Sequence, residues 1–99
     1  MKIKSDDGMA DVPATIISEG LALTDEKILT TYRGRQYVIF HVASGSTISS
    51  GRTKRIARRI GEMLAPLADW TLPQSQLQKI DGLLKKIVDA EKEAEAGNG

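Results

Sequence analysis

The segment from Gly51 to Leu67 constrains the fold of this 99-residue chain most, because its side chains divide between two faces of a helix. At about 100° per residue, one side is apolar and consists of Ile56, Ile60, Met63, Leu64 and Leu67. The opposite side carries Arg52, Lys54, Arg55, Arg58, Arg59 and Glu62. We therefore expect a helix over 51–67 that packs its apolar stripe on a core and turns its basic side outward.

Runs of β-branched and aromatic residues before this helix predict three antiparallel strands, over about 12–23, 27–33 and 36–43. The last two strands flank Arg33-Gly34-Arg35, which fits a tight hairpin with a two-residue turn. In that register, the face toward the helix carries Leu29, Thr31, Val38, Phe40 and Val42. The other face carries Ile28, Thr30, Tyr32, Tyr37, Ile39 and His41. A three-residue turn would change this assignment.

The remaining segments complete a single α+β domain over 12–95. The segment Ala43–Gly51 is expected as a linker in which Ser49 or Ser50 caps the helix, although Thr47–Ser49 also fits a short edge strand. A second helix is expected over about 73–92, with Pro73 in its first turn. Residues 1–11 are expected as a flexible arm and 96–99 as a disordered tail. The predicted fold is a small antiparallel sheet of two or three strands packed against two C-terminal helices.

Two partial resemblances follow from this plan. Over about residues 28–65, the order of elements is similar to small DNA-binding domains of three strands and a helix, such as the arm-binding domains of phage integrases, without a shared motif. The segment Gly45–Thr53 resembles a P-loop, but five residues separate its glycines and Arg52 stands where a lysine is needed. We expect no nucleotide hydrolysis there. An anchored phosphate remains the alternative to an ordinary capped helix start.

Positive charge is concentrated in the middle of the chain. Its net charge is only +1, but the span from Lys27 to Gly61 holds eight basic residues, no acidic residue and all six arginines. Because arginine suits phosphate and carboxylate partners, we predict a binding surface made of Arg33, Arg35, Arg52, Lys54, Arg55, Arg58 and Arg59. Tyr32 and Tyr37 are candidates for stacking on bases, or else they cover the sheet. The acidic residues of 89–95 are a candidate internal partner for the basic residues.

These features favour a small, non-enzymatic nucleic-acid-binding protein, with DNA preferred to RNA, of the kind that serves a phage or mobile element as an accessory regulator. The alternative is an inhibitor or adaptor whose arginines dock on an acidic surface of a host protein complex. The apolar stripe of the second helix leaves room for a homodimer in either case.

Several classes are disfavoured by composition. The chain has no cysteine and only one histidine, His41, so we expect neither a metal site, a cofactor nor a catalytic triad. We expect His41 at the sheet surface or half-buried. The sequence lacks an apolar run near eighteen residues and a secretory leader, which predicts no membrane association and a cytoplasmic location.

Overall fold

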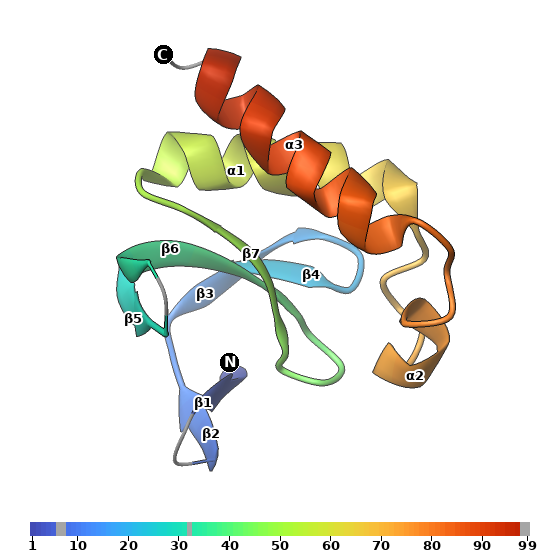
Figure 1. Ribbon diagram of the computed structural model, residues 1–99. Helices are drawn as coiled ribbons and strands as arrows, with labels where there is room; N and C mark the ends of the chain where they lie inside the picture. The colour runs from blue at the N-terminus through green and yellow to red at the C-terminus, as the bar shows by residue number, and fades with distance from the viewer. Residues whose placement is uncertain (6–7, 32, 98–99) are drawn as a thin grey trace.

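The structure is a computed structural model of the chain, and it describes residues 1–5, 8–31 and 33–97. The strands are β1 (Lys2–Ser5), β2 (Gly8–Asp11), β3 (Ala14–Ser18), β4 (Leu21–Thr24), β5 (Ile28–Thr30), β6 (Gly34–His41) and β7 (Thr47–Gly51). The helices are α1 (Lys54–Leu64), the 3₁₀ turn η1 (Ala65–Leu67), α2 (Gln74–Leu77) and α3 (Leu83–Gly97). Figure 1 shows α1 and α3 together above one face of the sheet, with β1 and β2 on its far side.

Strand β6 organises the five-stranded antiparallel sheet, because it pairs with β4, β5 and β7. The sheet order is β3-β4-β6-β5, with β7 beside β6, and β1 and β2 form a separate two-stranded sheet. The α+β class fits this structure. The prediction of a sheet with only two or three strands and two helices is wrong.

One glycine accounts for part of this difference. The segment predicted as one strand over 12–23 reverses at Gly20, whose φ of 87° is open to glycine but unfavourable for other residues. Residues before and after the turn then pair with each other as β3 and β4, with Thr15 opposite Leu23. The remaining extra strand is β7, which agrees with the edge strand over 47–49 that is the predicted alternative to a linker in this serine-rich segment.

The predicted flexible arm is also organised as strands. In the β1–β2 hairpin, Ile3 lies opposite Ala10, and the side chain of Ile3 is buried against Ala22, Val38 and Phe40. The backbone N–H of Lys4 donates to the carbonyl of Gly45, which ties the hairpin to the turn between β6 and β7. The sheet is therefore covered on both faces, and it separates two apolar clusters.

The predicted orientation of the β5–β6 hairpin, with Val38 and Phe40 toward the helix, is wrong. Thr30 pairs with Gly34, so three residues separate the last paired positions instead of two. The odd turn length changes which residues of β5 share a face with those of β6, so that Ile28 lies with Val38 and Phe40. This face turns away from the helices. Ile39 points instead into the apolar cluster between the sheet and helices α1 and α3, called here the helix-side cluster. Sequence alone did not reveal this, because three consecutive apolar residues carry no inside-outside alternation.

Helix α1 follows the predicted amphipathic pattern. Ile56, Ile60 and Leu64 are buried in the helix-side cluster, while Met63 and Leu67 are partly buried beside it. The N-cap is Thr53, whose hydroxyl oxygen accepts a hydrogen bond from the N–H of Ile56 at 3.2 Å, instead of the predicted Ser49 or Ser50. Pro66 lies in the 3₁₀ turn that ends the helix.

The helix predicted over 73–92 is divided in two. Helix α2 covers a single turn, and α3 starts after Gly82, whose φ is 74°. Helix α3 then continues beyond residue 92 to Gly97. Its buried stripe packs against α1 and β7 and consists of Leu83, Ile87, Ala90 and Ala94.

A buried hydrogen-bond chain holds the segment between α1 and α2 against the sheet. His41 is fully buried, and its Nε2 lies 2.9 Å from the carbonyl of Leu72, which can only accept. Nε2 therefore donates to this carbonyl, and Nδ1 lies 2.7 Å from the hydroxyl oxygen of Ser44. The indole N–H of Trp70 donates to the carbonyl of Leu64 at 2.8 Å. His41 is thus a structural residue in the core, not a residue of the sheet surface.

Candidate nucleic-acid interface

The outward side of α1 and the residue before its cap form a continuous basic face, defined here as Arg52, Lys54, Arg55, Arg58 and Arg59. All five residues are exposed. On the helix itself, the four basic residues spread over about 140° of the circumference, opposite the buried stripe. The structure thus brings these predicted site residues together on one surface.

The basic face has little local compensation. Its single acidic neighbour on α1 is Glu62, and the ion pair of Glu62 with Arg58 is long, at 4.0 Å, between two exposed side chains. Arg52, Lys54, Arg55 and Arg59 form no ion pair within the described parts of the chain. Lys54 and Arg55 also lie in the first turn, where the helix dipole favours negative side chains. An external anion would relieve both unfavourable arrangements.

Arg33, in the β5–β6 turn, and Arg35, near the start of β6, have different surroundings. Arg35 is exposed on β6, opposite Leu29. Arg33 instead contacts α3, where its Nη2 lies 2.9 Å from Oε2 of Glu91. The Glu91 side chain is only 15% exposed, whereas that of Arg33 is 51% exposed. A carboxylate of the protein itself therefore forms a close ion pair with Arg33, one of the predicted site residues. The two positions are 58 residues apart, so no local sequence pattern could indicate this contact.

Of the two tyrosines predicted as stacking candidates, the structure describes Tyr37. Tyr32 lies outside the described residues. Tyr37 is partly buried beside the helix-side cluster, with the ammonium of Lys27 6.0 Å from its ring centroid. The described tyrosine thus corresponds to the alternative in which the ring covers the sheet.

The segment that resembles a P-loop has a different structure. Residues 47–51 form β7, so Gly45 and Gly51 lie at opposite ends of a strand about 16 Å long. Ser49 and Ser50 are 5% and 7% exposed, and the Ser49 hydroxyl has no partner among the described atoms. A phosphate cradle would need exposed backbone N–H groups converging from a loop, and β7 pairs with β6 instead.

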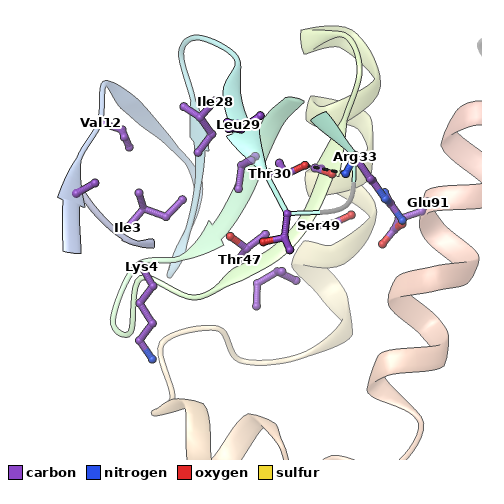
Figure 2. A pocket seen from close by; sticks show the side chains of 15 residues that line it. Ile3, Lys4, Val12, Ile28, Leu29, Thr30, Arg33, Thr47, Ser49 and Glu91 are labelled. Atoms are coloured by element: carbon purple, nitrogen blue, oxygen red, sulfur yellow. Dashed lines mark hydrogen bonds and ion pairs between the residues drawn. The ribbon is translucent and has the colours of Figure 1, made fainter. Parts of the chain in front are cut away.

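An open groove of about 740 Å³ lies beside the Arg33 turn. Figure 2 shows Ile3 and Val12 at one end of it and the Arg33–Glu91 pair at the other. Its apolar lining consists of Ile3, Ala10, Val12, Ile28, Leu29, Val38 and Ile48. The groove is not among the predicted sites, because it forms only with the β1–β2 hairpin, for which the alternation of polar and apolar residues in Lys2-Ile3-Lys4 is the available signal.

Within the described ranges, no helix has both the length and the apolar character required to cross a bilayer. Comparisons with protein-family models, with curated proteins and with solved structures find no match to this chain. The chemistry of these surfaces is therefore the basis on which a function can be assigned.

Proposed function

We propose that this chain is a non-enzymatic nucleic-acid-binding protein that contacts backbone phosphates through the basic face and through Arg33 and Arg35. The single observation that carries the proposal is that five clustered cations are exposed on and beside α1, and that within the described parts of the chain only Arg58 among them forms an ion pair, a long one with Glu62. Like charges three or four residues apart destabilise a helix by a few tenths of a kcal/mol each, and a polyanion removes this repulsion.

The expected binding is mainly electrostatic. About four to six phosphate contacts on duplex DNA give a slope of log affinity against log salt of roughly −4 to −5. Exposed arginines on a helix suit phosphate oxygens and, in the major groove, the O6 and N7 atoms of guanine. We expect duplex DNA to bind more tightly than RNA.

The test is fluorescence anisotropy with a labelled DNA duplex between 50 and 200 mM salt. The double variant Arg55→Gln/Arg58→Gln should weaken binding by about eightfold per arginine near 0.1 M salt and make the slope shallower by roughly 1.8. The matched control is Lys79→Gln/Lys85→Gln, which removes the same charge from exposed positions outside the basic face. Equal affinities for the two double variants, or a wild-type affinity that is insensitive to salt, would refute the proposal.

The groove favours a second candidate function, docking on an acidic protein surface. Leu29 is 74% exposed at its rim, and arginines lie beside this apolar lining. A protein partner would use both kinds of contact, whereas nucleic-acid phosphates gain nothing from Leu29. Leu29→Ser should therefore leave DNA affinity unchanged if the first proposal holds, and should weaken a protein complex by about tenfold if the second holds.

A further inference from the structure

Helix α3 distributes its terminal acidic residues in an ordered way. At about 100° per residue, they flank the buried stripe of α3 on both sides. One margin carries Glu91 and Glu95, and the other carries Asp89 and Glu93. The C-terminal half of α3 therefore turns one pair of carboxylates toward each side of the helix.

The first margin faces Arg33, in the β5–β6 turn, and Arg52, which follows β7. A recess of about 440 Å³ is lined by Arg33 and Arg52 on one side and by Glu91 and Glu95 on the other. Within it, the Arg33–Glu91 contact of 2.9 Å is a charge-assisted hydrogen bond, and Figure 2 shows the two side chains extended toward each other. Because Glu91 is mostly buried, solvent screens this pair less than an ordinary surface pair.

The second margin faces α1. Arg59 lines a recess of about 570 Å³ together with Lys86, Asp89 and Glu93. No ion pair joins Arg59 to these carboxylates in the described structure. The two margins thus differ: α3 engages Arg33 directly, whereas at Arg59 it contributes only negative charge near an open side chain.

We propose that α3 is a built-in competitor for the polyanion, in which the Glu91 carboxylate occupies the position on Arg33 that a phosphate would take. This inference rests on the proposed nucleic-acid binding and adds a regulatory contact to it. A phosphate can take the place of Glu91 at Nη2 of Arg33 only after this contact opens. Binding through Arg33 is therefore conditional, whereas binding through the exposed arginines of α1 is not.

The experiment compares Glu91→Gln with Asp81→Asn in the same anisotropy titration with duplex DNA. Both variants remove one negative charge, but Asp81 precedes α3, whereas Glu91 lies eight residues into that helix. The helical rise from Leu83 to Glu91 alone is about 12 Å, which exceeds the Debye length of about 10 Å at 0.1 M salt. We expect Glu91→Gln to bind DNA about three- to eightfold more tightly than the wild type, and to steepen the salt slope by about 0.9, the value of one added phosphate contact. Asp81→Asn should change affinity less than about twofold.

The change Arg33→Gln tests whether Arg33 is the residue through which Glu91→Gln strengthens DNA binding. In the wild type it should weaken DNA binding less than it does in the Glu91→Gln protein, because Glu91 competes with phosphate for the guanidinium. In the Glu91→Gln protein it should abolish the gain. A second release variant, Glu91→Gln/Glu95→Gln, should bind at least as tightly as Glu91→Gln, and circular dichroism checks that each variant is folded.

Two failures are distinguishable. If the wild type shows salt-dependent binding but Glu91→Gln and Asp81→Asn behave alike, the competitor is refuted and the nucleic-acid function stands. If no protein in the set binds DNA in a salt-dependent way, the function itself is refuted, and the competitor with it. Binding that appears only in the two Glu91 variants supports both proposals.

Discussion

The contact between α1 and β3 gives a sharp test of how the basic face is held in place. Gly61 is buried on the inner side of α1, and a Cβ atom added there would lie 2.2 Å from Cδ1 of Ile17. Alanine at position 61 gains about 1 kcal/mol of helix propensity over glycine. Overpacking at a buried contact costs about 1–3 kcal/mol, so Gly61→Ala should destabilise the protein by about 0–2 kcal/mol.

Shortening Ile17 should reverse this effect. Ile17→Val removes the Cδ1 atom that the new methyl group meets, and costs about 0.5–1 kcal/mol alone, because the side chain is only partly buried. The double variant keeps the helix propensity without the clash, so its stability should lie within about 0.5 kcal/mol of the wild type. The double variant should then be more stable, by about 1–3 kcal/mol, than the sum of the two single effects predicts.

Urea unfolding followed by the fluorescence of Trp70, the single and buried tryptophan, measures all four proteins. The added methyl group should contact Ile17 and no other side chain of β3. The control pair is therefore Gly61→Ala/Thr15→Ser, whose effects on the free energy of unfolding should be additive within about 0.5 kcal/mol. Additive free energies for Gly61→Ala and Ile17→Val would show that α1 does not rest on β3 at this position.

Two further predictions concern the polar residues that hold the segment between α1 and α2. His41→Leu leaves the carbonyl of Leu72 and the hydroxyl of Ser44 without their histidine partner, and should cost about 2–4 kcal/mol in urea unfolding. A loss below about 0.5 kcal/mol would contradict the stabilising role of this buried hydrogen-bond chain. Hydrogen bonds from the hydroxyl and N–H of Thr71 lower the pKa of Asp69 below its ordinary 3.8, so the ionised carboxylate stabilises the fold above that pH and loses its effect as the pH falls through the lowered pKa. The melting temperatures of wild type and Asp69→Asn should therefore differ at pH 6 and converge toward pH 2, and a constant gap would exclude this role.

The elements that could be predicted from sequence are those whose pattern is local. The stripe of α1 repeats every three or four residues, so both its buried residues and its exposed arginines follow from spacing alone. The basic face needed no tertiary information for the same reason.

The elements that could not be predicted depend on distant partners. The sequence indicates an edge strand over 47–49 only as an alternative to a linker, because Ser49 and Ser50 have the composition of a loop; the strand forms because β6 offers a free edge for pairing. The orientation of Val38 and Ile39 depends on which face of the sheet the helices cover, and a run of consecutive apolar residues does not indicate that face. The contact between Arg33 and Glu91 requires α3 to cross the end of the sheet, and no spacing in the sequence encodes that crossing.

The placement of β6 has a consequence for how the molecule opens. Around Ile39 and Phe40, β4 occupies one edge of the strand and β7 the other, while an apolar cluster covers each face. Amide protons in this short stretch can exchange with solvent only when pairing fails and both clusters come apart together. Their exchange should consequently report the global unfolding equilibrium, whereas α2, a single turn, is free to fray without disturbing it.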